Sequence, residues 1–338
     1  MSSEAKVAVC QGAQRTANLR CVLERVVDDI DWSSRQNVVV KPNVVMPSRP
    51  HAITHRDALD AVLEAVRTRY DGMLTVAEGC ALDSTTAAFE ALGYDSVASF
   101  YKAQLVDLNA DQAVPVTVFS RREGSVRVRV ARHIIDSDCR ISLSLPKTHD
   151  AVLVTLSIKN MVMGSLVNRR VARGKGRPAW QDRLGQLLRG HGNGWGSDKT
   201  AMHQGYPMLN INLALLAMIV RPALSVLDGF VGMEGAGPTD GTPVPWGIAV
   251  AGTDPMAVDT FAAHLMGFGV EEIGYLHYCS LLGLGCADLR HIDVLGNVAV
   301  EDIAREFVPH PQHQEQRAWH HPDAERLLQQ GRIVGETP

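Results

Sequence analysis

The sequence lacks the features that mark secreted and membrane-spanning proteins. Its first residues do not show a basic segment followed by an apolar one, which is the order that defines a signal peptide. No apolar run approaches the roughly 18 residues that a membrane-spanning helix requires. The longest candidate, residues 213–220, has the length of part of a buried helix. We therefore expect a cytoplasmic protein without a membrane partner.

Signatures of bound cofactors are also missing. None of the six cysteines belongs to a C-x-x-C pair, which excludes the usual spacing of zinc ribbons and ferredoxin-type clusters. The P-loop is absent, and the glycine-rich segment 228–241 does not lead into the helix that a dinucleotide fingerprint requires. We expect no bound cofactor, although a divalent metal is compatible with the sequence. Because most cysteines are flanked by apolar or small residues, we predict reduced thiols in the core.

The chain has little excess charge of either sign. Its net charge is -4 and its pI is near 6.3, which argues against a general nucleic-acid binder. We therefore expect no nucleic-acid partner, apart from what a local basic run at residues 169–177 could bind. With 338 residues and 46% hydrophobic content, the chain is long enough for one large domain or two. A homodimer is compatible with this composition.

The sequence repeatedly alternates short β-branched runs with longer amphipathic segments, a pattern typical of α/β proteins. We predict a mixed, mostly parallel sheet flanked by helices, with an antiparallel hairpin near residues 114–131. A single α/β domain should cover residues 1–300, followed by a C-terminal tail at 301–338. The domain could consist of two lobes, about 1–150 and 205–300, with a mobile insertion rich in arginine, glycine and histidine at 168–208.

Three local patterns make specific structural predictions. Thr54 is a natural N-cap for a helix whose apolar positions begin at Ala58. Residues 153–163 predict a helix ending at Gly164, and Asp254 before a proline predicts the N-cap of another helix. Residues 228–241 predict a wide glycine-rich turn between two strands.

Several polar clusters follow buried strands, and two of these clusters carry lysine. Lys41 ends a run of valines, and Pro42 prevents this strand from continuing normally. Lys147 and His149 lie two residues apart in an extended segment, so their side chains should point the same way. Ligands of α/β sheets bind at the carboxyl ends of the strands. We therefore predict that these residues meet in an anion-binding site, although each could also be a solvated residue at a strand end.

A further lysine, Lys159, lies in the apolar segment 153–163, one predicted helical turn after Thr155. It could extend to solvent, or it could reach the same site as Lys147. If it is desolvated or faces other cations, its pKa falls and it can act as a base or as a Schiff-base amine.

The glycine-rich turn offers both carboxylates and backbone amides. Asp228 and Glu234 could bind a metal or take part in acid–base catalysis. Closely spaced glycines such as Gly235 and Gly237 let backbone N–H groups approach an anion. A purely structural turn is the alternative. Asp259, within the next predicted helix, matters if it faces the site.

The basic run at 169–177 begins with Arg169 and Arg170 and could hold phosphate or carboxylate groups. It could also be a flexible gate with glycine hinges, or an ordinary solvated loop. The tail histidines at 310–321 fit no standard metal spacing, and we expect them in solvent or at an interface.

Together these motifs resemble the family called domain of unknown function 362. The resemblance covers roughly residues 37–296 and implies a shared polar site with little settled chemistry. Many members carry a ferredoxin-like four-iron cluster module, whose cysteine run is absent here. The resemblance is carried by Val39-Val-Lys-Pro-Asn43, Thr54-His55, Val76-Ala-Glu-Gly79, Leu145-Pro-Lys-Thr-His149, Thr155-Leu-Ser-Ile-Lys-Asn160 with Gly164, Leu227-Asp-Gly229, Met233-Glu-Gly-Ala-Gly-Pro238 and Ala251-Gly-Thr-Asp-Pro-Met-Ala-Val-Asp259.

The leading hypothesis is a small-molecule enzyme for an anionic, carboxylate-bearing substrate, with lyase, isomerase or cyclase chemistry suited to biosynthesis. The lysines would hold the anion or stabilise an enolate-like charge, and His149 would move the proton. The alternatives are an enzyme of the same site that depends on a divalent metal, a noncatalytic anion or nucleic-acid binding protein, and a redox protein related to the iron–sulfur members of the family.

The predicted site residues fall into three groups. The catalytic candidates are Lys41, Lys147, His149, Lys159 and Glu234. The substrate-binding candidates are Asn43, Thr54, His55, Glu78, Asn160, Asp228, Gly235, Gly237, Arg169 and Arg170. The metal alternative would draw on His55, Glu78, His149 and Asp228, with Glu234 as a further carboxylate.

Overall fold

The computed structural model describes residues 5–169 and 197–335, with side chains up to residue 331. Most of the predicted mobile insertion at 168–208 therefore lies outside the described residues. No helix within the described ranges is long and apolar enough to cross a membrane.

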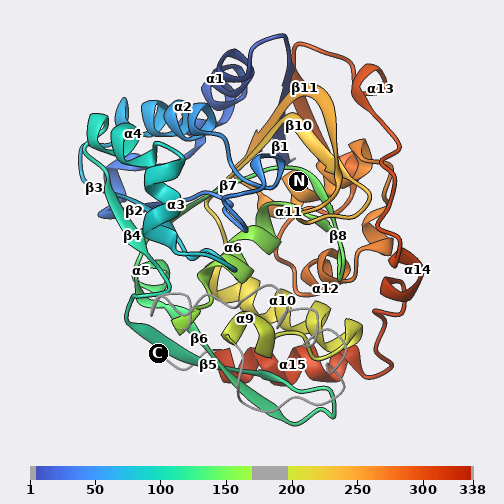
Figure 1. Ribbon diagram of the computed structural model, residues 1–338. Helices are drawn as coiled ribbons and strands as arrows, with labels where there is room; N and C mark the ends of the chain where they lie inside the picture. Colours follow the sequence, from blue (N-terminus) through green and yellow to red (C-terminus); the bar gives the residue numbers. More distant parts are fainter. Residues whose placement is uncertain (1–4, 170–196, 336–338) are drawn as a thin grey trace.

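A ten-stranded mixed sheet forms the centre of the molecule (Figure 1). Along its main path the strands follow the order β12-β1-β11-β10-β7-β2-β3-β4, and only the two pairs that involve β11 are antiparallel. A short hairpin of β8 and β9 joins this sheet through β10. The prediction of a mixed, mostly parallel sheet is thus confirmed. The strands are β1 (Ala5–Gln11), β2 (Asn37–Lys41), β3 (Met73–Glu78), β4 (Gln104–Asp107), β7 (Cys139–Ser144), β8 (Lys147–His149), β9 (Leu153–Thr155), β10 (Leu224–Glu234), β11 (Thr242–Gly252) and β12 (Ile292–Gly296).

Helices cover both faces of the sheet, because its central strands are apolar on both sides. In β2, Val38 and Val40 pack into one hydrophobic core, whereas Val39 packs into the other. The first core is covered by α1 (Arg15–Val26), α2 (Arg56–Arg67), α3 (Thr85–Ala91) and α4 (Tyr94–Phe100), and the second by α6 (Ser157–Ser165), α10 (Tyr206–Val220), α11 (Pro255–Leu265) and α12 (Gly274–Leu281) (Figure 1).

The predicted hairpin near residues 114–131 is present, and it forms a small sheet of its own. Strands β5 (Ala113–Phe119) and β6 (Ser125–Ala131) pair antiparallel over their full length. Val128 and Val130 are buried while Arg127 and Arg129, which alternate with them, are exposed, as the alternating sequence requires. The hairpin packs against α10 and the C-terminal helix α15 (Ala324–Gly335).

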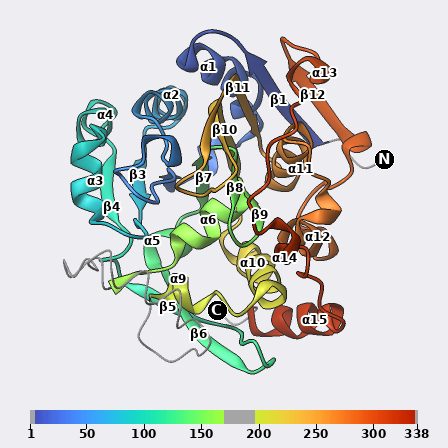
Figure 2. The ribbon, with the colours of Figure 1, turned by 45° about the vertical axis from the view of Figure 1, so that its right-hand side comes forward.

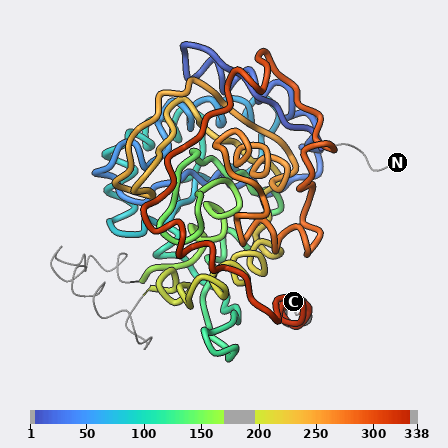
Figure 3. The backbone as a smooth tube through the Cα atoms, turned by 90° about the vertical axis from the view of Figure 1, so that its right-hand side faces the viewer, coloured from blue at the N-terminus to red at the C-terminus, as the bar shows by residue number. Residues whose placement is uncertain are grey.

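The C-terminal segment runs along one side of the molecule, as the red part of the tube in Figure 3 shows. It contains the helices α13 (Val300–Ile303), α14 (His313–Gln316) and α15, and it buries Phe307, Trp319 and Leu327 in the second core. Short segments elsewhere complete the fold: η1 (Val27–Asp29), η2 (Trp32–Ser34), η3 (Pro50–Ala52), α5 (Arg132–Ile135), α9 (Asp198–Ala201), η4 (Val270–Glu272) and η5 (Leu289–His291).

The segment 153–163 is not one helix, contrary to the sequence prediction. Leu153 adopts a φ of 62° and begins strand β9, which pairs with β8, and α6 starts only at Ser157. The apolar composition of this segment suits a buried strand as well as a buried helix, so periodicity could not separate them. Thr155 therefore lies opposite Lys147 across the hairpin and not on a helix with Lys159.

Two further local predictions need correction. The N-cap of α2 is His55, whose Nδ1 accepts the Asp57 N–H, while Thr54 is buried one residue earlier. The segment 228–241 is not a wide turn throughout, because β10 continues to Glu234 and pairs with β11 beyond a β-bulge. The predicted N-cap at Asp254 is confirmed by its bonds to the Met256 and Ala257 N–H groups.

The sequence predicted reduced core thiols, but two of the cysteines form a disulfide. Cys10 in β1 and Cys21 in α1 form a disulfide, while Cys80, Cys139 and Cys279 are buried free thiols. The spacing of 11 residues between the two partners carried no recognisable pairing signal.

Asp259 fixes the start of α6 from a different helix. Its two carboxylate oxygens accept the N–H groups of Ser157 and Ile158, which are the first two of α6. Burial raises the pKa of Asp259 to about 7, and the two N–H bonds oppose this rise. Asp259 in α11 thereby supplies the N-terminal cap that the α6 sequence itself lacks.

We expect Asp259→Ala to lower the free energy of unfolding by about 2 kcal/mol, because two buried N–H groups lose their acceptor. Asp259→Asn keeps one acceptor oxygen and should lose less. Urea unfolding at pH 8, where the carboxylate is ionised, measures both. Exposed Asp302 provides the control, since Asp302→Ala should change stability by less than about 0.5 kcal/mol. Equal effects at the two positions would contradict the capping role.

Candidate functional site

The two predicted lysine-bearing clusters and Glu78 meet at the carboxyl edge of the parallel strands. Lys41 ends β2, Glu78 ends β3 and Ser144 ends β7. Strand β2 lies between β7 and β3 and is hydrogen-bonded to both. The β8–β9 hairpin and the start of α6 lie at the same edge (Figure 2). The topology therefore assembles residues from five elements in one place.

Lys41 is the most completely bonded member of the site. Its Nζ donates to Glu78 Oε2 at 2.8 Å, to Asn160 Oδ1 at 3.0 Å and to the Pro42 carbonyl at 3.0 Å. All three ammonium hydrogens thus have acceptors, which a fully buried lysine requires. Gly164 makes room for this side chain, because a Cβ there would lie 1.8 Å from Lys41 Cε.

Lys147 is linked to Lys41 through two asparagines. Its Nζ donates to Asn43 Oδ1 at 2.6 Å and to the Ala52 carbonyl at 2.8 Å. Asn43 Nδ2 in turn donates to Asn160 Oδ1, the same atom that accepts from Lys41. Thr54 Oγ1 accepts the Asn43 N–H and donates to the Leu143 carbonyl, which fixes the loop after β2.

Two further lysines lie beside this network and are less bonded. Lys159, in the first turn of α6, has no hydrogen-bond partner for its Nζ among the residues that the structure describes. Lys199, in α9, has one acceptor within the described ranges, the Gly79 carbonyl. Lys41 and Lys147 are 0% exposed, whereas Lys159 and Lys199 keep 8% and 9%, so the less bonded pair is the one nearer to solvent.

Lys199 was missed by the sequence analysis. It lies in the segment 168–208 that is rich in arginine, glycine and histidine, and its only local signal is the N-cap Ser197 of a single helical turn. Its neighbour Asp198 pairs with Arg129 of the β6 strand, which orients α9 toward the site. The chain contains seven lysines, and four of them are buried here.

Burial lowers the pKa of three of these lysines. Lys147 is shifted well below its ordinary value by desolvation and then by the charges of Lys159 and Lys41, with Glu78 opposing. Desolvation lowers the pKa of Lys159 to about 8 despite the opposing charge of Asp150. Desolvation also lowers the pKa of Lys199 to about 8, against the attraction of Glu78.

The site holds more positive than negative charge. The buried carboxylates of the described residues are Glu78, Asp198, Asp228 and Asp259. Asp198 pairs with Arg129, Asp228 with Arg15, and Asp259 caps α6, so that only Glu78 bonds to a lysine of the site. Such an excess of buried cations favours an anionic ligand.

His149 is held as a neutral imidazole. Desolvation and the nearby cations, Lys159 first among them, lower its pKa well below the ordinary value. Its Nδ1 accepts the Ala151 N–H at 3.0 Å, which places the ring proton on Nε2. The Asp150 carboxylate also lies 3.1 Å from Nδ1, but a backbone N–H can only donate, so we assign Nδ1 as an acceptor. In this structure His149 is thus a hydrogen-bond donor through Nε2.

Two buried hydroxyls at the site are unpaired. Ser144 Oγ, at the end of β7, and Thr155 Oγ1, opposite Lys147 in the β8–β9 hairpin, have no hydrogen-bond partner among the described residues. Ser144 shares a strand face with Ser142, whose hydroxyl accepts from Asn160. Buried polar groups are rarely left unsatisfied, so these hydroxyls are candidates for contact with a ligand.

Asp228 and His55 do not join the lysines, although the sequence grouped them. Asp228 forms a 3.0 Å ion pair with Arg15 of α1 and lies on the other face of the sheet. Asp228 directly follows Leu227 on β10, and successive side chains of a strand point to opposite faces of the sheet. Leu227 packs in the second core, so Asp228 points away from it. Burial lowers the pKa of His55, and the charge of Arg15 lowers it further while Asp57 and Asp228 oppose the shift.

The glycine-rich turn also serves a structural purpose. The Gly235 N–H donates to the Val308 carbonyl, and the Gly237 N–H donates to the Gly235 carbonyl, so neither is directed at the lysines. Glu234 accepts the Val308 N–H and so holds the C-terminal segment. The Gly235 carbonyl accepts from Thr148 Oγ1, which packs this turn onto β8.

The remaining predictions concern the basic run and the metal alternative. Arg169 donates to the Ala110 carbonyl. Arg170 and the rest of the gate predicted at 169–177 lie outside the described residues.

No three of His55, Glu78, His149, Asp228 and Glu234 have ligand atoms within 4.8 Å of one another. In the described part of the chain, Glu123, His321 and Asp323 meet that distance, on the surface and in contact with Arg326.

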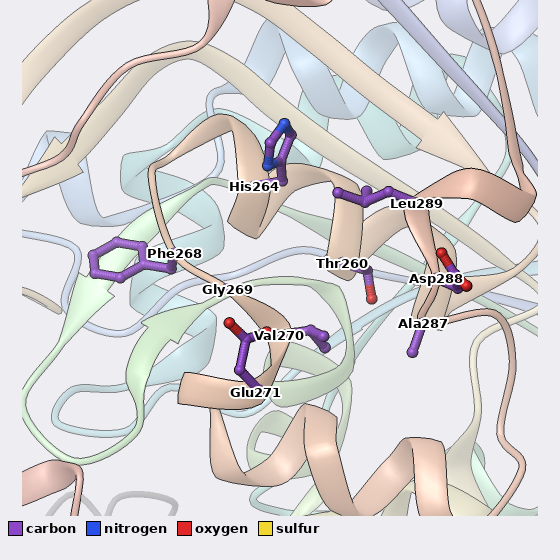
Figure 4. Close-up of a pocket in the computed structure, with 9 residues that line it drawn as sticks. All are labelled: Thr260, His264, Phe268, Gly269, Val270, Glu271, Ala287, Asp288 and Leu289. Atoms are coloured by element: carbon purple, nitrogen blue, oxygen red, sulfur yellow. The ribbon is translucent and has the colours of Figure 1, made fainter.

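A cavity of about 420 Å³ lies elsewhere, between the end of α11 and the η4 and η5 turns (Figure 4). Phe268, Val270 and Leu289 line it, with Glu271 and Asp288 among its charged residues. None of the predicted site residues contributes to its wall.

The fold and the site define a mixed α/β protein with a lysine-lined polar centre at the carboxyl edge of its sheet. Residues 38–264 match the model of the family described as domain of unknown function (DUF362), and the chain belongs to this family. A curated relative, the thylakoid-associated protein sll1697 of Synechocystis sp., is 24% identical over 224 residues, which cover 66% of this chain. The chain matches 60% of that relative's length. The lactate racemase apoprotein from Thermoanaerobacterium thermosaccharolyticum aligns with 73% of this chain and 54% of its own, at 13% identity and a TM-score of 0.43.

We expect Gly164→Ala to lower the free energy of unfolding by about 2 to 3 kcal/mol, because the new methyl group would displace Lys41 from its three acceptors. Urea unfolding measures the change. Gly124→Ala, in the exposed β5–β6 turn, is the matched control and should cost much less. Similar losses at both glycines would show that Lys41 does not depend on this close approach.

Because the pKa of Lys159 is lowered in the folded state, this residue destabilises the fold most at low pH. Its ordinary value is 10.5 and its value here is about 8, so the folded state binds fewer protons than the unfolded state between these pH values. Below pH 8 both states are protonated, and burial of the charge destabilises the fold in full. Above pH 10.5 both are neutral and the cost is gone.

We therefore expect Lys159→Met to raise the free energy of unfolding at pH 7 by about 1 to 3 kcal/mol, with the gain shrinking between pH 8 and pH 10.5. Unfolding in urea at pH 7, 9 and 10.5 tests this. Lys6→Met is the control, because its exposed pair with Asp29 should contribute little at any pH. A variant less stable than the wild type at pH 7 would contradict the prediction.

Proposed function

We propose that this protein is an enzyme acting on a small, carboxylate-bearing anion, with its chemistry at the lysine centre. The observation that carries the proposal is the burial of Lys41, Lys147, Lys159 and Lys199 around a single bonded carboxylate, Glu78. A bound anion would offset the remaining positive charge. The unpaired hydroxyls of Ser144 and Thr155 add uncharged donors for its oxygens.

The four lysines fall into two functional pairs in this proposal. Lys41 donates to three protein acceptors and Lys147 to two, and both shape the inner wall. Lys159 and Lys199 lie nearer to solvent and keep hydrogens free for a ligand. With a pKa of about 8, Lys159 is mostly charged at neutral pH, yet it can lose its proton easily.

This arrangement suits the removal or transfer of a proton next to a carboxylate. The neutral form of Lys159 would accept the proton, and the nearby ammonium groups would stabilise the enolate-like charge that develops. His149 would donate a hydrogen bond through Nε2. Lyase, isomerase and cyclase reactions all use such a step, and preorganised charge of this kind contributes several kcal/mol in a water-poor site.

Anion binding is the part of the proposal that can be tested without a known substrate. We expect sodium malonate or sodium phosphate to raise the melting temperature more than sodium chloride does at equal ionic strength, by the stabilisation that follows from binding to the folded state. The double variant Lys159→Met, Lys199→Met should lose this difference. Lys6→Met, which removes an exposed lysine, should keep it.

Two outcomes would overturn the proposed anion site. One is an equal response to chloride, malonate and phosphate in the wild type, which would indicate ordinary salt effects. The other is a specific response that persists in the double variant, which would place anion binding elsewhere on the protein.

A further inference from the structure

We infer that Lys159 forms a covalent imine with its substrate, and that the substrate is a 2-oxo acid, whose carbonyl group lies next to a carboxylate. This inference rests on the proposed function and narrows it, because it names both the reacting atom and the class of anion. The case for it comes from the position of Lys159 in α6 and from the partners of the four lysines.

Lys159 occupies an unfavourable place for a cation. It is the third residue of α6, where the positive end of the helix dipole favours acidic side chains. The first two N–H groups of the helix are directed at Asp259, on the α11 side, so that this carboxylate caps the helix without bonding to the lysine. The helix start therefore adds to the forces that favour a neutral amine at this position.

The hydrogen bonds separate Lys159 from the other three lysines. Lys41 donates to three acceptors, Lys147 to two and Lys199 to one, and each of these bonds holds the nitrogen in place. Among the described residues, Lys159 Nζ has none, although the side chain is only 8% exposed. An amine without acceptors gains nothing from staying protonated, and it can approach a carbonyl carbon without first breaking a bond.

The charged groups around Lys159 fit the environment of a nucleophilic lysine. Lys41 and Lys199 lower its pKa in addition to burial, and Asp150, half exposed in the turn between β8 and β9, opposes them. Lys147 and the neutral His149 are also close enough to feel the charge of Lys159. Lysines next to other cations in dry sites are those that form Schiff bases.

The same neighbours account for the carboxylate of a 2-oxo acid. In the part of the chain that the structure describes, Lys199 Nζ donates one bond, to the Gly79 carbonyl, so its other two hydrogens can bind a carboxylate beside the reacting carbonyl. An aldehyde or ketone without a carboxylate would lack this contact. The site should therefore select oxo acids over uncharged carbonyl compounds.

The proposed step is balanced in atoms and charge. The lone pair of neutral Lys159 Nζ attacks the carbonyl carbon, and the carbonyl oxygen leaves as water with the two hydrogens of the amine. A carbon–nitrogen double bond forms, and one proton from solvent converts the imine to its cation. The cation then withdraws electrons from the neighbouring carbon and eases the loss of a proton from that carbon to solvent water, because the Lys159 nitrogen is now bonded to the substrate and no longer serves as the base.

Reductive trapping tests the inference on the intact chain. The protein is incubated at pH 7.5 with pyruvate or glyoxylate and sodium cyanoborohydride, and peptide mass mapping locates any secondary amine. We expect the adduct on Lys159 in at least about tenfold excess over the exposed Lys6 and Lys102. Propanal, which has no carboxylate, should label Lys159 far less selectively, and urea-unfolded protein should show no preference.

Variants make the result specific. Lys159→Arg keeps the positive charge but cannot form an imine, so it should lose the adduct at position 159. Lys199→Met should reduce labelling by pyruvate at Lys159 without moving it to another lysine. Labelling spread over Lys6 and Lys102 as strongly as Lys159 would overturn the inference.

The inference and the proposed function fail in distinguishable ways. If malonate stabilises the wild type through Lys159 and Lys199 but no oxo acid is trapped at Lys159, the anion site stands and the imine is wrong. If neither malonate nor phosphate binds, both are wrong.

Discussion

The ion pair between Lys41 and Glu78 is the interaction on which the rest of the site depends. Lys41 is 0% exposed, and acceptors for its ammonium hydrogens offset the cost of burying its charge, because an unpaired buried charge costs several kcal/mol. Three elements supply those acceptors: the end of β2 through Pro42, the end of β3 through Glu78, and α6 through Asn160. The requirement to satisfy one nitrogen thus fixes where α6 lies relative to the sheet. Gly164, one turn further along α6, is what allows that approach.

The other lysines of the site form fewer hydrogen bonds than Lys41, and the two nearest to solvent form the fewest. Lys147 is tied to Lys41 through Asn43 and Asn160, whereas Lys199 has a single acceptor and Lys159 none among the described residues. Buried groups that are not satisfied lower the stability of the fold, and such groups persist mainly where a function requires them. The unpaired hydroxyls of Ser144 and Thr155 belong to the same incomplete side of the site.

The sequence predicted the sheet and about half of the site. The other half was missed mainly because the sequence does not show to which face of the sheet each strand residue points. Lys41 and Glu78 meet because the ends of β2 and β3 share an edge of the sheet, and that edge can be read from alternating strands and helices. Lys147, at the start of β8, and Asn160, in α6, reach the same edge. Whether a side chain at that edge turns to one face or the other depends on its exact register. Asp228 lies one residue beyond Leu227 and therefore turns away, toward Arg15. Lys199 could not be found because α9 reaches the site only through tertiary contacts such as Arg129–Asp198.

Helix α6 shows the conflict between local and tertiary rules most directly. Its first turn contains a lysine and no acidic residue, which is the reverse of what a helix start favours, and its own N-cap residue offers no side-chain bond. The missing negative charge comes from Asp259, about one hundred residues later in the chain, and it serves the backbone rather than the lysine. The helix is therefore stabilised without neutralising Lys159. A simpler solution, an acidic residue within the first turn itself, would hold the helix equally well but would form an ion pair with Lys159 and remove its reactivity. The distant cap keeps the two requirements, a stable helix and an unpaired amine, from excluding each other.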